Sequence, residues 1–393
     1  MTYMDRTIGE CFYQIQNGAN IKQGNANGGY PITRIETIAN DKFNRDRMGY
    51  AGINDISKYE SYILEDGDLL MSHINSIQYL GRTVLYEKIE EETIIHGMNL
   101  LRLRARSDII NPSYARYCFY GHLFRSQIAN ITKKSVNQAS FAIQDLKQIK
   151  IDVPEVRLQK QIVEILNKIS WIIEKRKQEL DTFGELIRAR FVEMFGYPSI
   201  NNKRWQMGVI NEIGSCIAGA TPSTKVDEYW NNGTIPWMSS GEVNKGRVDR
   251  TDNFITHLGY DKTSTKLVPP KTVVLAMAGQ GKTRGMAAIT EIELCTNQSI
   301  CSIVNNEKVD AEYLLYFLKL QYNELRRAST NTDGRGGLNL KIIGNYPIMI
   351  PPVALQKYFA TFVTQVNKSK VEVQRALDEA QLLFDSLMQK YFG

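Results

Sequence analysis

The octapeptide VPEVRLQK at residues 153–160 returns as IPPVALQK at residues 350–357. The two copies are 197 residues apart, and at the same offset the Phe-Gly pair at 195–196 falls on the Phe-Gly pair at 392–393. A period of about 200 residues is far longer than the repeat of a solenoid protein. The repeat therefore indicates one large unit that occurs twice in the chain.

The similarity extends backwards from the octapeptides with small drifts in offset. DLLMS at 68–72 matches TVVLA at 272–276, and LGRTVL at 80–85 matches RGMAAI at 284–289, both at an offset of 204. Each half is thus predicted to hold a globular domain of about 150 residues and then a segment of about 42 residues. The predicted bounds are 1–153 for the first domain, 154–196 for its segment, 197–350 for the second domain and 351–393 for its segment.

The two segments are predicted to be long helices, because apolar residues recur in them at steps of three and four. Prolines stand where each segment starts and glycines where it ends, as expected for helix ends. Forty residues give a rod of about 60 Å. We expect the two rods to pack antiparallel as a coiled coil, rather than each on its own domain alone. The predicted packing residues are Leu158, Ile162, Ile165, Ile169, Leu180, Leu355, Phe359, Phe362, Val366, Val373, Leu377 and Phe384.

The globular parts read as mixed α/β (α+β) domains in two pseudo-symmetric copies. Short strand patterns such as GDLLMSH and RTVLYEKI alternate with turn residues. In each half one helix is predicted directly after a capping residue, Asn111 in the first copy and Asp310 in the second. The predicted fold is therefore two such domains joined by two long antiparallel helices.

The bulk composition is that of an ordinary globular protein, with 43% hydrophobic and 23% charged residues among 393. There is no apolar run long enough for a membrane helix and no signal-peptide pattern at the N-terminus, so we expect a cytoplasmic protein without a membrane partner. Five scattered cysteines and four histidines show no metal-ligand spacing. The net charge of +6 permits nucleic-acid binding without requiring it.

The stretch LAMAGQGKTRG at 275–285 resembles a nucleotide-binding loop, because Gly-Lys-Thr follows an apolar run. The pattern G-x-x-x-x-G-K-[ST] requires a glycine at position 276, and the residue there is Ala276. The following residues predict a turn and a strand instead of the helix that such a loop needs. At the offset of 204, residues 281–283 match Ile77-Gln78-Tyr79. A loop that keeps its place and changes its side chains is typical of a recognition surface.

Catalytic patterns are sparse in this chain. Asn111-Pro112-Ser113-Tyr114 resembles the motif of adenine methyltransferases, but its counterpart Asp310-Ala311-Glu312-Tyr313 has no such character. The feature that the two copies share is a helix cap followed by an apolar stripe. No nucleophile elbow or zinc-protease motif occurs either. The sequence thus favours binding over chemistry, with no catalytic residue, metal or cofactor of its own.

The duplicated order resembles the specificity (S) subunit of type I restriction–modification systems. The resemblance rests on two domains of about 150 residues, each followed by a long helix that is entered through [VI]-P-x-V-x-L-Q-K and ends at Phe-Gly. The domain openings fit as well: Ile8-Gly9-Glu10 with Glu212-Ile213-Gly214, and Tyr30-Pro31-Ile32-Thr33-Arg34 with Ile235-Pro236-Trp237-Met238-Ser239. It covers essentially the whole chain.

This resemblance implies a DNA-reading subunit in which each target recognition domain reads one half of a split, asymmetric site in double-stranded DNA. The helices would set the gap between the half-sites and dock two methyltransferase (M) subunits, which carry S-adenosylmethionine. Restriction (R) subunits would carry the chemistry that depends on ATP and Mg. Two alternatives remain open: the specificity subunit of a type II-like fused restriction–methylation enzyme, and a coiled-coil scaffold without a DNA role.

The candidate DNA-binding residues are polar or basic positions that correspond across the repeat, since Lys and Arg meet phosphates and Arg, Asn, Gln, Ser and Thr read bases. In the first domain they are Lys22, Gln23, Arg34, Lys42, Arg45, Arg47, Ser72, His73, Asn75, Gln78, Lys133, Lys134, Asn137 and Gln138. In the second they are Thr221, Ser223, Lys225, Trp237, Ser239, Ser240, Lys245, Arg247, Gln280, Lys282, Arg284, Asn331, Arg335 and Asn339.

Overall fold

A computed structural model describes residues 4–22, 24, 28–135, 138–279, 281–329 and 337–393. The chain divides into two compact units. Unit 1 contains the chain up to Lys177 together with Arg375–Gly393, and unit 2 is Gln178–Gln374. Each unit therefore holds one globular part and a stretch of each of the two long helices, α5 (Val156–Phe195) and α11 (Val353–Phe392). The predicted division treats each long helix as one separate segment, whereas both units contain a part of each helix. The four-segment division stays a prediction.

Unit 1 is built on a four-stranded antiparallel sheet in the order β2-β8-β5-β7. Its strands are β1 (Met4–Thr7), β2 (Phe12–Asn17), β3 (Pro31–Ile32), β4 (Gly49–Tyr50), β5 (Leu69–Ser72), β6 (Ile74–Asn75), β7 (Thr83–Leu85), β8 (Leu100–Ala105), β9 (Lys133–Lys134), β10 (Ala139–Ser140) and β11 (Lys150–Val153). Its short helices are α1 (Ile8–Cys11), α2 (Pro112–Tyr120), α3 (His122–Ile131) and α4 (Ile143–Gln148), with 3₁₀ turns η1 (Ile35–Asp41), η2 (Arg45–Arg47), η3 (Ser57–Tyr62) and η4 (Ile77–Tyr79).

The central strand β5 is buried on both faces of this sheet. Leu69 and Met71 belong to the core that α2 and the long helices cover, whereas Leu70 packs on the other face with Tyr86. Successive side chains of a strand point to opposite faces, so the continuous apolar run of β5 supplies both layers. Because β5 is buried on both faces, its sequence is a continuous apolar run in which polar residues do not alternate with apolar ones.

Unit 2 repeats this plan with a five-stranded sheet in the order β13-β20-β17-β18-β15. Its strands are β12 (Gln206–Val209), β13 (Gly214–Ala218), β14 (Ile235–Met238), β15 (Arg247–Val248), β16 (Asn253–Ile255), β17 (Val273–Ala276), β18 (Ala287–Thr290), β19 (Cys295–Thr296), β20 (Ile300–Asn305) and β21 (Pro347–Ile350). Its short helices are α6 (Ile210–Ile213), α7 (His257–Asp261), α8 (Ala311–Leu320), α9 (Tyr322–Ala328) and α10 (Leu340–Gly344), with 3₁₀ turns η5 (Asp227–Tyr229) and η6 (Ser240–Lys245).

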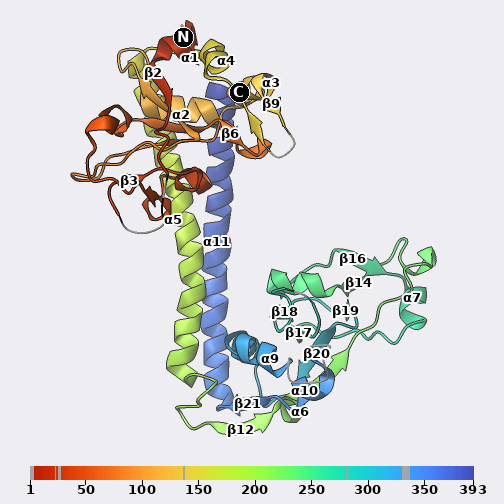
Figure 1. Cartoon of the computed structure of the whole chain (residues 1–393). Helices are drawn as coiled ribbons and strands as arrows, with labels where there is room; N and C mark the ends of the chain where they lie inside the picture. Colours follow the sequence, from red (N-terminus) through yellow and green to blue (C-terminus); the bar gives the residue numbers. More distant parts are fainter. Residues whose placement is uncertain (1–3, 23, 25–27, 136–137, 280, 330–336) are drawn as a thin grey trace. The chain divides into compact units, whose positions relative to one another are not determined.

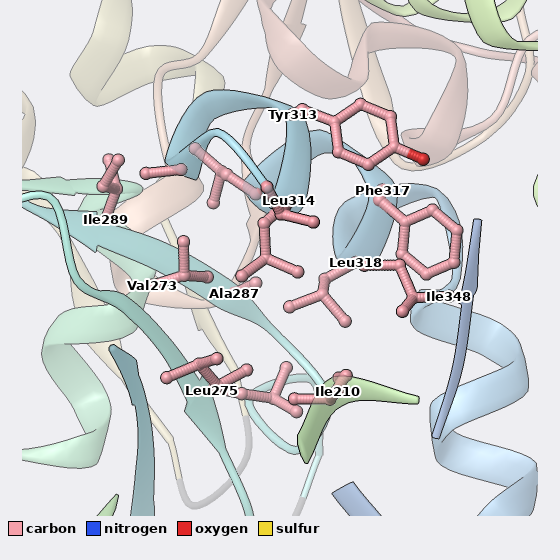
Figure 2. Packing of buried hydrophobic residues seen from close by; sticks show 14 of the residues in the cluster. Ile210, Val273, Leu275, Ala287, Ile289, Tyr313, Leu314, Phe317, Leu318 and Ile348 are labelled. Carbon is pink, nitrogen blue, oxygen red and sulfur yellow. The ribbon is translucent and has the colours of Figure 1, made fainter. Parts of the chain in front are cut away.

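The core of unit 2 lies between this sheet and helix α8. Figure 2 shows Leu314 and Leu318 of α8 pointing towards the sheet, where Val273 and Ala287 come from β17 and β18. All of these side chains are at least 95% buried. The predicted strand–loop–strand at 275–285 is present, because β17 and β18 pair antiparallel and no helix follows the loop. This geometry is unlike that of a nucleotide-binding loop, which opens into a helix.

The two units confirm that the chain carries the same mixed α+β fold twice. In each unit a strand near the start pairs antiparallel with the strand that precedes a long helix: β1 with β11, and β12 with β21. The predicted caps are also present, since Asn111 accepts a hydrogen bond from the Tyr114 amide and Asp310 accepts one from the Glu312 amide. The structure corrects one sequence match. Helices α1 and α6 occupy equivalent positions in the two units, so Ile8-Gly9-Glu10 corresponds to residues 210–212 and not to residues 212–214.

Within each unit, the stretches of the two long helices lie side by side and run in opposite directions (Figure 1). In unit 1 the early part of α5 shares a core with the end of α11, including Ile162 and Phe384. In unit 2 the end of α5 meets the early part of α11, where the ring centroids of Phe191 and Phe359 lie 5.5 Å apart. The helices start at Val156 and Val353, two residues after the predicted bounds, because prolines precede both of them.

Most of the predicted packing residues of the two helices are buried or half-buried, but Ile165 is a correction. Its side chain is 43% exposed, whereas the next residue, Leu166, is fully buried. Leu166 and Val163 pack against the globular core of unit 1 as well as against α11. The buried face of α5 in unit 1 therefore includes residues that contact the globular domain. This part of α5 packs on its own domain and on α11 together.

The glutamine of the repeated octapeptide explains why this motif is preserved in both halves. The Gln159 side chain is completely buried; its Oε1 accepts from the Asn111 amide at 2.7 Å, and its Nε2 donates to the carbonyls of Pro154 and Ile109 at 2.7 and 2.9 Å. Gln356 repeats the arrangement with the amide of Asp310 and the carbonyls of Pro351 and Lys308. Each glutamine thus ties the start of a long helix to the turn before α2 or α8.

Candidate nucleic-acid interface

Each unit carries one candidate interface of its own: the loop after β5 in unit 1 and the loop after β17 in unit 2. The backbone closes both loops in the same way: Gly81 donates to the Ser72 carbonyl at 2.8 Å, and Gly285 donates to the Ala276 carbonyl at 2.9 Å. In each unit, a backbone amide from a later part of the chain binds the first residue of the loop. The Phe141 amide donates to the His73 carbonyl, and the Leu338 amide donates to the Met277 carbonyl. The two loops therefore share a frame, while their side chains differ.

In unit 1 this frame brings five predicted residues into one neighbourhood. The small sheet β6-β10-β9 places Ala139 between Asn75 and Lys134. Lys133, Lys134 and Gln138 are exposed, and Asn75 is half-buried. Gln78 is exposed on η4, which follows β6. A lysine and an asparagine thus flank Ala139 on neighbouring strands, a combination of side chains that can meet phosphates and base edges.

In unit 2 the corresponding neighbourhood contains Lys282, Arg284 and Asn339. Lys282 is exposed and Arg284 is half-buried in the loop. Asn339 is exposed too, but its Oδ1 accepts from the Ile342 amide and so caps α10. Five predicted residues lie outside the described part of the chain: Gln23, Asn137, Gln280, Asn331 and Arg335.

Three predicted residues are buried and do not reach a surface. Ser72 is completely buried, and His73 is 5% exposed. Burial lowers the pKa of His73 to about 4, so its ring is neutral at ordinary pH. Trp237 is 6% exposed and donates its indole N–H to the Ala220 carbonyl. These residues continue strands or strand ends into the core, and we remove them from the set proposed to contact DNA.

Several predicted basic residues are bound by acidic side chains or backbone carbonyls of their own unit. Arg45 makes two hydrogen bonds to Glu92, at 2.6 and 2.9 Å, and this contact holds the pKa of Glu92 down at about 2. Lys42 pairs with Glu174 at 3.2 Å, although both side chains are largely exposed. Arg34 donates to the Gly24 carbonyl at 2.8 Å. These contacts account for three of the predicted cations in unit 1, and Lys22 and Arg47 are exposed.

Two of the predicted basic residues of unit 2 are likewise bound to acids of their own unit. Arg247 bridges Glu291 and Glu312 at 2.6 and 2.5 Å, and Lys245 bridges Glu242 and Asp252. The remaining predicted residues of this unit lie before β14 or at the start of η6. Thr221, Ser223 and Lys225 are exposed, and Ser239 and Ser240 are half-buried. Exposed predicted cations therefore occur in these loops, as Lys282, and outside them, as Lys22, Arg47 and Lys225.

Sequence reasoning missed two arginines beside these loops, Arg125 on α3 and Arg326 on α9. Both donate to loop carbonyls. A signal was present, because the two are related at an offset of 201 residues. Among the described residues no group of histidine, cysteine and acidic side chains could hold a metal ion. The described helices also include none that is long and apolar enough to cross a membrane.

Comparison with known proteins adds independent information. A family model described as "Type I restriction modification DNA specificity domain" matches residues 2–182 and again residues 202–380. A specificity subunit assigned to the type I restriction enzyme MjaX of Methanocaldococcus jannaschii is 26% identical, over 94% of this chain and 88% of the relative. The EcoR124I/EcoR124II specificity subunit of Escherichia coli is 23% identical over 55% of each chain.

Solved structures show the same fold. The S subunit of a type I restriction–modification system from M. genitalium matches 100% of this chain and 96% of its own, with a TM-score of 0.63 at 14% identity. A chain from a structural study of type I R-M complex assembly matches 99% of this chain and 97% of its own, with a TM-score of 0.60 at 15% identity. At these identities the likeness concerns the fold alone.

Proposed function

The chain belongs to the family of type I restriction–modification DNA specificity subunits, and from this premise we propose that it reads DNA for a complex whose catalysis lies in other subunits. The observation that supports this function best is the duplicated frame with divergent loops. The loop after β5 and the loop after β17 are closed by equivalent backbone hydrogen bonds. Their exposed side chains differ, as Gln78 stands where the second copy has Lys282.

In this proposal each domain reads one half of a split site in double-stranded DNA. The domain bounds are 1–153 and 197–350, and the helical segments are 154–196 and 351–393. Because the two loops carry different side chains, the two half-sites have different sequences, and the whole site is asymmetric. The helices fix the distance between the half-sites without reading bases, and half-sites on one side of a duplex recur at about 34 Å per turn.

The long helices are also proposed to dock two methyltransferase subunits. Several large apolar side chains on these helices are exposed within their own units, including Trp171 at 63%, Val371 at 66% and Leu382 at 72%. Contiguous exposed apolar surface is typical of binding faces, and these side chains are the candidates for such a face. The methyltransferase subunits supply S-adenosylmethionine and methylate adenine, and restriction subunits supply the steps that use ATP and Mg. The complex acts in the cytoplasm, where its DNA lies.

Sequencing of adenine methylation tests this function directly. The DNA of a host that carries this chain with its methyltransferase partner is compared with the DNA of the same host after deletion of the chain. We expect a bipartite, asymmetric methylation motif that disappears on deletion and returns on complementation. An unchanged methylation pattern after deletion would contradict the proposal, whereas a continuous or palindromic motif would contradict the two-domain reading.

A further inference from the structure

The base of each candidate loop rests against the helix that follows α2 or α8, which is α3 in unit 1 and α9 in unit 2. Gly81 and Gly285 have φ values of +70° and +85°, a region that favours glycine. A Cβ atom on Gly81 would lie 3.4 Å from the Ile128 side chain of α3, and one on Gly285 would lie 3.3 Å from the Arg326 side chain of α9. The helix therefore passes directly beside the loop in both units.

One arginine of this helix binds the loop backbone at the same place in both units. Arg125 Nη1 donates to the Leu80 carbonyl at 2.9 Å. Arg326 Nη1 donates to the Arg284 carbonyl at 3.3 Å and to the Gly281 carbonyl at 2.6 Å. Leu80 and Arg284 each stand immediately before the glycine. The contact therefore occurs at the same place in both units. This is so although the two arginines are 201 residues apart in the chain and the two loop glycines are 204 residues apart.

Each arginine is itself fixed by an aromatic ring. The Arg125 guanidinium lies over the Tyr120 ring at 5.2 Å, and that of Arg326 lies over the Tyr322 ring at 5.5 Å. The hydroxyl groups of both tyrosines also bind backbone carbonyls: Tyr120 donates at 3.1 Å to Thr83, the first residue of β7, and Tyr322 donates at 2.8 Å to Lys282 in the loop after β17. Stacking of this kind restricts a planar guanidinium more than it restricts an ammonium.

The loop residues next to these contacts point outwards. Ile77 is 57% exposed and Tyr79 is 37% exposed in unit 1, and Lys282 is exposed in unit 2. The arginines bind main-chain carbonyls and leave these side chains free to differ. A carbonyl contact holds the path of the backbone whatever side chains the loop carries. Base readout demands such a fixed backbone, because hydrogen bonds to base edges require well-defined distances and angles.

We propose that Arg125 and Arg326 are matched positioning residues, each of which holds one recognition loop in the conformation that reads its own half-site. This inference rests on the proposed DNA-reading function and adds residues that need not touch DNA themselves. The two arginines act independently, since each contacts a loop of its own unit. Loss of one therefore relaxes base preference in one half-site and leaves the other half-site intact.

The test uses the full chain assembled with its methyltransferase subunits and a plasmid library of randomised sites, read by sequencing of adenine methylation. Arg125→Gln and Arg326→Gln are compared with the wild type and with Arg327→Gln, which alters the next residue of α9, a largely exposed arginine paired with Glu324. Each good base contact discriminates about five- to a hundredfold. We expect discrimination to fall by about tenfold or more in one half-site for Arg326→Gln and in the other for Arg125→Gln.

Arg327→Gln should keep the base preference of both half-sites. Uniformly weaker methylation with unchanged preference, or relaxation of both half-sites by one variant, would overturn the positioning role, because a merely structural defect acts in this way. If Arg326→Gln does not assemble, Tyr322→Phe removes one loop hydrogen bond and is judged by the same criterion. A wild type without any split motif would instead refute the proposed function, so the two failures can be told apart.

Discussion

Replacement of Gln159 by leucine should destabilise unit 1 selectively. The change removes three hydrogen bonds, from the Asn111 amide and to the carbonyls of Pro154 and Ile109, and leaves those groups with no partner of similar geometry. The loss is about 1–3 kcal/mol for the buried contact and about 1 kcal/mol for each partly buried one. Burial of the leucine side chain returns about 1 kcal/mol. The net loss is thus about 2–4 kcal/mol.

Hydrogen exchange is the appropriate assay, because a chain with two units has no single free energy of unfolding. Peptides from α2 report on unit 1, and peptides from α8 report on unit 2. A loss of 2–4 kcal/mol corresponds to exchange about 30- to 1,000-fold faster in α2. The control is Gln161→Leu, which makes the same change at an exposed position two residues along the same helix.

The repeat supplies the reciprocal experiment. Gln356→Leu should accelerate exchange in α8 and leave α2 protected, because Gln356 binds the backbone before α8. Unchanged exchange in α2 of the Gln159→Leu variant would refute the reasoning, as would an equal effect of Gln161→Leu. Equal loss of protection in both helices would show that the two units do not unfold separately.

Two further predictions concern charge. Arg45 holds the pKa of Glu92 at about 2, below its ordinary value of 4.5. This pair should therefore stabilise unit 1 above about pH 4.5 and lose its effect as the pH falls towards 2. Arg45→Met should remove this part of the acid dependence of the urea midpoint of unit 1, and an unaltered acid dependence would contradict the assignment. Lys134→Ala should lower the slope of log K against log salt for DNA binding by about 1, without changing base preference. Lys88→Ala, at an exposed position of unit 1, is the control, and an equal effect of this control would contradict a specific phosphate contact.

The sequence predicted the duplicated architecture and the helices well, because these features depend on periodic patterns. Apolar steps of three and four specify a helix whatever it packs against. The exact buried stripe was harder to predict. Ile165 and Leu166 are both apolar neighbours on one helix, and the choice between them depends on a globular core that forms from residues far away in the chain, such as Tyr114.

The candidate site was predicted less completely, since residue type alone does not tell whether a polar side chain faces a ligand or a neighbour. Arg45 and Arg247 look alike as candidates with Lys282, yet the first two are bound to Glu92 and to Glu291. These acids lie 47 and 44 residues away in the chain. Arg125 and Arg326 were missed for the opposite reason: they serve the loops from helices, at positions that a search for loop residues excludes.

The drift of the repeat offset carries mechanistic information of its own. The offset is 197 at the long helices, 201 at the arginines of α3 and α9 and 204 at the loop glycines. The segments between these elements therefore differ in length between the two copies, whereas the contacts that join the elements persist in both units. If the two domains bound identical ligands, the exposed loop residues would be expected to match between the copies as well. Here the buried glutamines and the loop-binding arginines are retained while the exposed residues at 77–79 and 281–283 differ, which favours two readers with one mechanism and two different targets.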